Sequence, residues 1–195
     1  MFMSGNLDER RLVDPIRAEE ASKQGPCPIL WDVRRPVTSA TLTNATGVNP
    51  ELSDPVTDPP SRRLVIVCKQ LPWPIYIKKY SAIRCEDVLD HVYASLQERL
   101  TVGEYYMAGP EKRRVIDAVN EKETNNSSSK RKWITTRVNG HERTRLDQPY
   151  RVDILDRQVL FKGLFYDRRI IAERLAHDPE AQEDAWVLSL GETEW

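Results

Sequence analysis

The sequence predicts an α+β fold, with a mainly antiparallel or mixed sheet and two to three helices packed on one face. Three observations predict it. The continuous apolar run at residues 64–68 is typical of a central strand buried on both faces. From Glu86 the apolar period becomes that of a helix. Strand-like runs return at residues 159–161 and 186–190. Strands, then helices, then strands favour α+β.

The N-terminal part of the 195-residue chain is polar and mixed in charge. We predict that residues 1–26 form a flexible arm, in which Asp14-Pro15 starts a short helix. Residues 27–195 are predicted to form one α+β domain, a size typical of a single core. Its first strand is expected at residues 28–33. The loop that follows, residues 38–60, is rich in Thr, Asn, Pro and Asp.

Prolines frame the second pair of strands. Leu71-Pro72-Trp73-Pro74 forces extended backbone before a strand at residues 75–77. Proline cannot donate to a strand ladder, so Pro74 is predicted at the start of that strand or at a sheet edge.

The central segment predicts three helical stretches. Thr101-Val102-Gly103-Glu104 reads as a capping box that opens the second helix, and Gly109-Pro110 interrupts that helix. Residues 111–120 form the third stretch. The first helix has an apolar face made of Val88, Leu89, Val92, Tyr93, Leu96 and Leu100.

A polar, low-complexity segment at residues 120–132 predicts a disordered loop. After it, Asn139-Gly140 is the strongest hairpin signal in the chain, and a helix across the same residues is the competing prediction. The predicted cross-strand pairs are Arg137 with Glu142, Thr135 with Thr144, and Trp133 with Leu146.

Further along, residues 152–155 predict a strand that turns at Asp156-Arg157 into the strand at 159–161. Residues 164–176 fit either a helix or irregular structure.

Composition excludes several classes of protein. Net charge is −1, which gives no global argument for nucleic acid or membrane. The three cysteines form no CxxC pair, and no metal or cofactor motif occurs, so we expect no metal and no cofactor. The N-terminal residues lack an apolar signal core, and no apolar run has the length of a membrane span. The expected location is cytoplasmic or nuclear.

Several motifs occur together in a familiar order: ILWDVRRPVTSA, LVIVCKQLPWPIYI, EDVLDHVYASL, VDILDRQVLFKGL and WVLSLG. In this order they resemble an uncharacterised domain family of mushroom-forming basidiomycete fungi, over roughly residues 28–191. WDVR and LPWP are the most specific parts. The family tends to continue a basic helix where this chain has NNSSSK. The resemblance implies a fungal source and a single compact domain, and it implies no activity.

Two tryptophan motifs are candidate binding sites. On a strand, Asp32 and Arg34 would share one face and Trp31 the other. The favoured interpretation is a core tryptophan beside a structural ion pair, and the alternative is a polar recognition face. Trp73, held between prolines, is either a core plug or an aromatic anchor for a partner, with the core plug favoured.

Catalytic candidates are weak. His91 lies one helical turn after Asp87, but the nearest nucleophile, Cys85, falls on another helix face. Asp153 lies in an apolar run, where a structural carboxylate bonded to backbone is the favoured interpretation. His141 and His177 stand alone. We therefore predict that the protein is not an enzyme.

Charge is polarised along the chain. Residues 111–169 carry fifteen Lys and Arg against nine Asp and Glu, whereas residues 170–195 carry one against seven. Three interpretations follow from this polarity. In the first, the acidic part folds over the basic part of the same chain, and in the second the two parts meet between subunits. In the third, the basic part binds nucleic acid through Lys130, Arg131, Lys132 and Trp133. A solvated mixed surface is the default interpretation.

Three hypotheses for function remain. The first is a non-catalytic protein-interaction or self-association module, because exposed strand edges and a proline-framed tryptophan occur without a catalytic constellation. The second is single-stranded nucleic-acid binding through the basic 111–169 surface. The third is a hydrolase or transferase of unrecognised type, which would need Asp153, His91 or Asp32 to converge in a pocket.

Overall fold

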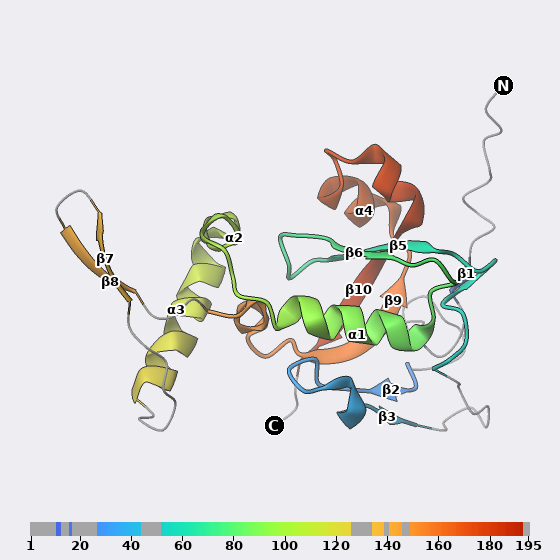
Figure 1. Cartoon of the computed structure of the whole chain (residues 1–195), viewed down its shortest axis with the longest axis horizontal. Coiled ribbons are helices and arrows are strands. Elements are labelled where there is room, and N and C mark those ends of the chain that lie inside the picture. The colour runs from blue at the N-terminus through green and yellow to red at the C-terminus, as the bar shows by residue number, and fades with distance from the viewer. Residues whose placement is uncertain are drawn as a thin grey trace.

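A four-stranded mixed sheet organises the structure, a computed structural model that describes residues 11–12, 16, 27–43, 52–125, 134–138, 141–145 and 149–192. The strand order is β6-β5-β10-β9 (Figure 1). β5 pairs in parallel with β10 and antiparallel with β6, and β10 pairs antiparallel with β9. The strands are β5 (Arg63–Cys68), β6 (Ile75–Lys78), β9 (Leu160–Phe165) and β10 (Ala185–Gly191).

β5 is central because its side chains are apolar on both faces. Leu64, Ile66 and Cys68 belong to the main core, while Val65 and Val67 belong to a second apolar cluster on the other face. The predicted strand at 64–68 is confirmed, and so is Cys68 as a small core residue.

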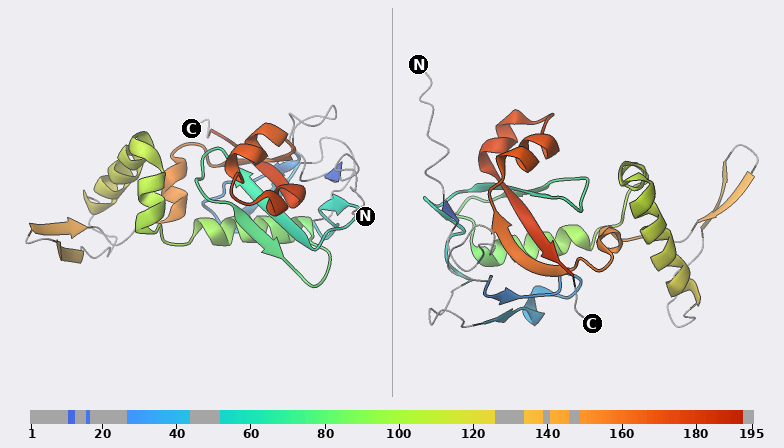
Figure 2. Two further views of the ribbon diagram at one scale, coloured as in Figure 1. Left: turned by 90° about the horizontal axis from the view of Figure 1, so that it is seen from above. Right: turned by 180° about the vertical axis from the view of Figure 1, so that it is seen from behind.

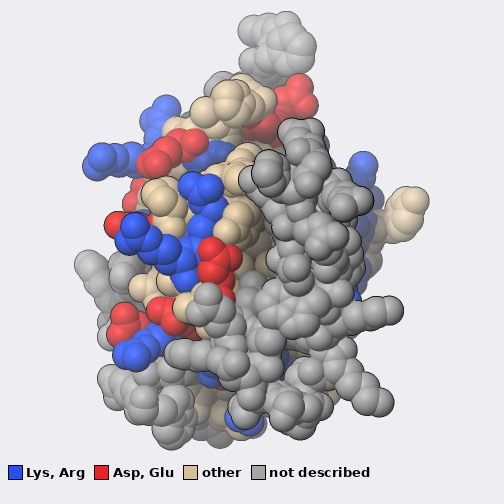
Figure 3. All heavy atoms as spheres, turned by 90° about the vertical axis from the view of Figure 1, so that its left-hand side faces the viewer, with Lys and Arg blue, Asp and Glu red and all other residues tan. Residues whose placement is uncertain are grey.

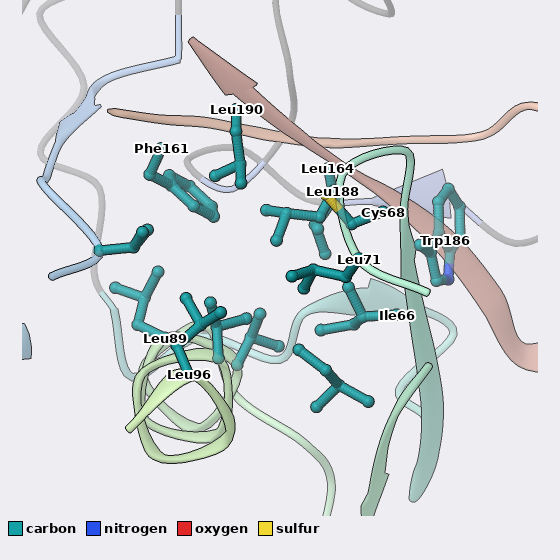
Figure 4. Close-up of a cluster of buried hydrophobic side chains, with 14 of the residues drawn as sticks. Ile66, Cys68, Leu71, Leu89, Leu96, Phe161, Leu164, Trp186, Leu188 and Leu190 are labelled. Atoms are coloured by element: carbon teal, nitrogen blue, oxygen red, sulfur yellow. The ribbon is translucent and has the colours of Figure 1, made fainter. Parts of the chain in front are cut away.

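The main core lies between the sheet and α1 (Cys85–Leu96). Leu89 and Leu96 project from α1 towards Ile66, Phe161, Leu188 and Leu190 of the sheet (Figure 4). The predicted apolar helix face is buried as expected, except that Tyr93 is only half-buried.

Helices cover both faces of the sheet, which differs from the predicted cover on one face. α4 (Arg168–Arg174) and the 3-10 helix η5 (Pro179–Asp184) pack Ile171, Leu175 and Ala181 on the face opposite α1. The reason lies in β5 and β10, whose continuous apolar runs need cover on both sides. The α+β class itself is confirmed.

The two edges of the sheet differ. Beyond β9, the Asp32 bridge to Leu160 and a bond from Phe161 N to Trp31 O (2.8 Å) continue the pairing. β6 pairs with β5 alone among the described strands. β6 is short and begins after Pro74, as predicted. Both features hinder pairing of this open sheet edge with a strand of another chain.

Short strands surround the sheet. β2 (Ile29–Leu30) pairs with β3 (Thr41–Leu42), with the 3-10 helix η3 (Val37–Ser39) between them, and β1 (Arg11–Leu12) pairs with β4 (Thr57–Asp58). The predicted strand at 28–33 is therefore shorter than expected. Part of the predicted 38–60 loop forms β3 and β4.

Three positions of the predicted arm are described, and two of them lie in the core. Leu12 and Ile16 are buried, and Ile16 O accepts a bond of 2.7 Å from Leu164 N in β9. The rest of residues 1–26, including the expected short helix, lies outside the described residues.

A helical pair and a hairpin extend to one side of the sheet (Figures 1 and 2). They are α2 (Val102–Met107), α3 (Gly109–Asn125), β7 (Ile134–Val138) and β8 (His141–Arg145). The hairpin is confirmed with the predicted pairs Arg137–Glu142 and Thr135–Thr144. The third predicted pair, Trp133 with Leu146, lies outside the described residues.

Two sequence predictions in this half are wrong. Residues 151–155 form a 3-10 helix, η4 (Arg151–Leu155), instead of a strand. The Asp153 carboxylate accepts the Tyr150 N–H at 2.8 Å, a capping bond that favours a helical turn. α3 also continues to Asn125, so the polar loop begins later than residue 120, and the remainder of the predicted loop is outside the described residues.

Candidate interaction surface

A capping box fixes the start of α2. Glu104 N donates to Thr101 Oγ1 at 3.2 Å, and Thr101 N donates to Glu104 Oε2 at 2.8 Å, as the sequence predicted. After Ala108 the backbone turns at Gly109, whose φ of 79° is in the left-handed region. This turn starts α3 immediately, so α2 and α3 form a bent pair.

Arg151 anchors that pair to the rest of the structure. From η4 its guanidinium donates to Glu104 Oε1 at 2.6 Å and also pairs with Glu98, just after α1. It lies over the Trp73 ring, 4.8 Å from the ring centroid. One arginine thus joins α2, the end of α1, η4 and the β5–β6 loop.

The Glu104 carboxylate is held ionised although the residue is 8% exposed. Burial acts to raise the pKa of this carboxyl, but hydrogen bonds from Arg151 and Thr101 outweigh burial and lower the pKa. The charge-assisted contact with Arg151 is therefore complete at neutral pH.

The outer side of α2 exposes large apolar groups. Val102 is 45% exposed, Tyr106 58% and Met107 63%. The Tyr105 and Tyr106 rings meet edge to face with centroids 5.5 Å apart, and the Arg113 guanidinium lies 5.7 Å from the Tyr106 centroid. We call Val102, Tyr105, Tyr106, Met107 and Arg113 the tyrosine–methionine surface.

Hydrogen bonds to neighbouring residues hold two side chains of this surface. Tyr105 OH donates to the Asp117 carboxylate of α3 at 3.0 Å, and Arg113 NεH donates to Gly109 O at 3.3 Å. Tyrosine, methionine and arginine are enriched at the centres of protein interfaces, because they offer large contact areas. Figure 3 views the molecule from the left-hand side of Figure 1, and positive and negative side chains intermix over the described part of that face.

The sequence did not single out this surface, although a signal was present. Tyr105, Tyr106 and Met107 are consecutive, so a helix cannot turn all three towards one core. At least one large apolar side chain must then face outwards.

Trp31, Asp32 and Arg34 have structural contacts. Trp31 is 1% exposed, and its Nε1 donates to Arg35 O at 3.0 Å. Arg34 Nη2 pairs with Asp32 Oδ2 at 2.6 Å. This is the core tryptophan and local ion pair that the sequence analysis favoured over a recognition face.

Trp73 is also in the core, at 9% exposed, and its ring is covered by Arg151. The core-plug interpretation is thus the one that the structure fits. Lys130, Arg131, Lys132 and Trp133 lie outside the described residues.

The catalytic candidates do not share a site. His91 Nδ1 lies 2.7 Å from Asp87 O, while the Asp87 carboxylate pairs with Lys79 at 2.5 Å. Burial raises the pKa of the Cys85 thiol to about 12, so the nucleophilic thiolate is scarce at neutral pH. Asp153 bonds to backbone at its own helix start. Each side chain serves a local contact.

The acidic C-terminal part contacts residues outside the basic segment. Asp184 pairs with Arg63 of β5 at 3.4 Å, and Tyr76 OH of β6 donates to Asp178 at 3.2 Å. Glu173 and Glu180 are exposed. We call Glu173, Asp178, Glu180 and Glu183 the acidic face, and the first turn of α4 beside it exposes Arg168 and Arg169. The acidic face belongs to α4 and η5, which lie apart from α2 and α3 in all three ribbon views (Figures 1 and 2).

Two kinds of site are absent from the described part of the chain. No three His, Cys, Asp or Glu side chains gather there in a way that could hold a metal ion. Nor is any of its helices both long and apolar enough to span a bilayer.

Comparison with known protein families assigns most of the chain to one family. Residues 29–178 match the model of DUF6699, a family of unknown function. The chain belongs to the DUF6699 family. This match includes β2, the central sheet strands up to β9, and the helices from α1 to α4. The resemblance to a domain family of unknown function is thereby confirmed. No curated protein and no solved structure matches the chain.

Proposed function

We propose that this DUF6699 domain is a non-catalytic module that self-associates, with the tyrosine–methionine surface of one copy docked on the acidic face of another. The observation that carries the proposal is the exposure of Tyr106 and Met107 on a helix held by two capping bonds and by Arg151. A preorganised apolar surface loses little freedom on binding.

Charge complementarity selects a second copy as the partner. Arg113 belongs to the tyrosine–methionine surface, and Arg114 is exposed on the next position of α3. Within one copy, Asp178 accepts a hydrogen bond from Tyr76 of β6 and Asp184 pairs with Arg63 of β5, and both partners lie outside the basic 111–169 segment. With a net charge of −1, two copies do not repel one another strongly.

Sedimentation velocity over a wide range of concentrations tests the proposal. The wild type should associate, and the double variant Tyr106→Ala/Met107→Ala should remain monomeric, because it loses the apolar contact. Tyr80→Ala is the matched control, since Tyr80 is fully exposed in the β6–α1 loop. It should behave as wild type.

Melting curves of all three proteins separate loss of association from loss of folding. Association should also weaken with salt, because exposed charges are screened. A wild type that stays monomeric at millimolar concentration, or a double variant that associates as the wild type does, would overturn the proposal.

One observation favours a second candidate function, single-stranded nucleic-acid binding. The β7–β8 hairpin extends away from the sheet (Figure 1), and its strands contain Arg137, Arg143 and Arg145 against one glutamate. Backbone phosphates are bound by such cations in a salt-dependent way. A fluorescence titration with a mixed-sequence oligonucleotide in low salt should show binding. An unchanged signal at that salt would remove this candidate.

The motif order also supports a basidiomycete fungal source. The sparse, widely spaced cysteines Cys27, Cys68 and Cys85 suit a reducing compartment and so support a cytoplasmic or nuclear location. The distribution of a fluorescent fusion in fungal cells tests the location. A secreted or membrane-bound fusion would contradict it.

A further inference from the structure

A cavity of about 260 Å³ opens where four segments meet: the β5–β6 loop, the first turns of α3, the turn after η4, and the end of β10. Val115, Ile154 and Leu155 supply an apolar lining, and the two residues of η4 are buried. Its lining also includes exposed charged side chains and the half-buried amides of Gln70 and Gln158. The cavity is separate from the tyrosine–methionine surface.

Lys112 supplies the half-buried cation of this cavity, and Arg157 supplies a second, exposed one. The one hydrogen bond of the Lys112 side chain among the described residues goes to the carbonyl oxygen of Gln70. No carboxylate of the described residues pairs with it, in contrast to Arg151 with Glu104 and Lys79 with Asp87. Burial, the largest cause, lowers the pKa of Lys112, and the nearby Arg174 lowers it further. An ammonium with three donors therefore has spare capacity for an anion.

Two glutamines line the cavity beside that ammonium. Gln70 Nε2 donates to Gln158 Oε1 at 2.5 Å, and Gln70 Oε1 accepts from Cys68 Sγ at 2.9 Å. These bonds fix the orientation of the Gln158 amide, because its oxygen is already an acceptor. Its NH2 group is left to donate.

Asp156 holds the neighbouring turn in a costly conformation. Its φ is 52° and its ψ is −113°, although it is not a glycine. The bond from Gln158 N to Leu155 O, 2.9 Å, closes the turn and places residues 155–158 along the cavity. Strained positions of this kind concentrate at ligand sites, where the conformation itself is needed.

We propose that this cavity binds a small organic carboxylate, with the carboxylate on Lys112 and the Gln158 amide and an apolar body against Val115, Ile154 and Leu155. The lining also carries three carboxylates, Glu111, Asp156 and Glu192, against the two cations. Their repulsion disfavours a more highly charged anion such as phosphate. The volume is below the 300–1,000 Å³ or so of common ligand pockets, which limits the body to a few carbon atoms. A free acid and the last residue of a peptide offer the same chemistry.

Proton–nitrogen NMR on the full chain tests the site, with N-acetyl-leucine as the free acid and its uncharged amide as the matched ligand. The acid should shift the side-chain amide signals of Gln70 and Gln158 and the backbone signals of residues 154–158. The amide should not. Lys112→Gln should weaken binding of the acid by about tenfold or more, while Lys78→Gln, at an exposed position of β6 outside the cavity, should leave binding unchanged.

Two further titrations identify the source of the carboxylate. A pentapeptide that ends in leucine with a free carboxyl should bind more tightly than N-acetyl-leucine if chain termini are the ligand, and no more tightly if the ligand is a free acid. Equal shifts by the acid and its amide, equal binding by the Lys112→Gln variant, or no shift by either carboxylate would overturn the site. The comparison of acid with amide uses only the wild type, so it holds even if Lys112→Gln fails to fold.

Discussion

At the scale of single residues, Arg151 holds α2, which carries the tyrosine–methionine surface, in position. It satisfies the carboxylate of Glu104, which is nearly buried, and its guanidinium covers Trp73. Without Arg151 the Glu104 charge would lose its strongest partner in a poorly solvated place. The position of α2 beside η4 therefore depends on this ion pair.

Arg151→Met should reduce the free energy of unfolding by about 2–4 kcal/mol, less than a fully buried pair because both side chains retain some solvent contact. Urea denaturation measures it. The matched control is Arg62→Met at an exposed position just before β5, which should change stability by less than about 0.5 kcal/mol. Equal effects of the two substitutions would show that the ion pair does not hold α2.

The same pair makes stability depend on acid. The pKa of Glu104 is lowered in the folded state relative to its usual 4.5. Its contribution is fully present above that value and is lost as the pH falls through the lower folded pKa. Wild type should therefore lose stability relative to Glu104→Gln when denaturation is measured at successively lower pH below 4.5. A constant difference across that range would contradict the assignment.

At the scale of elements, the bend between α2 and α3 depends on one glycine. Gly109 has a φ of 79°, whereas Gly103 lies within α2 with no atom within 4 Å of an added Cβ. Gly109→Ala should cost about 1–2 kcal/mol, because an L side chain is disfavoured at that φ. Gly103→Ala should stabilise by up to about 1 kcal/mol, since alanine favours helix. Thermal denaturation of both variants measures the contrast, and a similar loss in each would refute it.

Elements with strong local patterns could be predicted from the sequence. The apolar period of α1, the capping box of α2 and the Asn-Gly pair that predicts the hairpin all act over a few residues. The structure contains both helices and the paired strands β7 and β8. η4 was missed because the apolar residues Val152, Ile154 and Leu155 around Asp153 suggest a short strand, while the Asp153 capping bond favours the helical turn. The cover on both sheet faces was implied by the apolar run of β5, but which helix covers which face depends on long-range packing.

Most of the tyrosine–methionine surface and of the cavity beside Lys112 could not be predicted from the sequence. The sequence suggested Trp31 and Trp73 as candidate binding residues. Large apolar rings are mostly buried in folded proteins, and both of these tryptophans are buried. The contacts of Arg151 join segments that are far apart in the chain, so no local sequence pattern predicts these contacts. The cavity beside Lys112 likewise forms only when four segments meet.

At the scale of the whole molecule, part of the N-terminal segment belongs to the main core. Ile16 is fully buried and its carbonyl accepts a bond from β9. Ile16→Ala should lower the free energy of unfolding by about 2–4 kcal/mol, the cost of a cavity in a packed core. Leu30→Ala, at a site 55% exposed, should cost much less. Equal, small effects in urea denaturation would show that the segment is dispensable.

The central claim is that two complementary surfaces of one chain meet between copies. Charge reversal tests it most directly, by sedimentation velocity of Arg114→Glu, Glu180→Arg and the double variant. Each single reversal places like charges opposite one another and should weaken association, and the double variant should restore it. A double variant no better than the weaker single variant, or single reversals without effect on association, would contradict the claim.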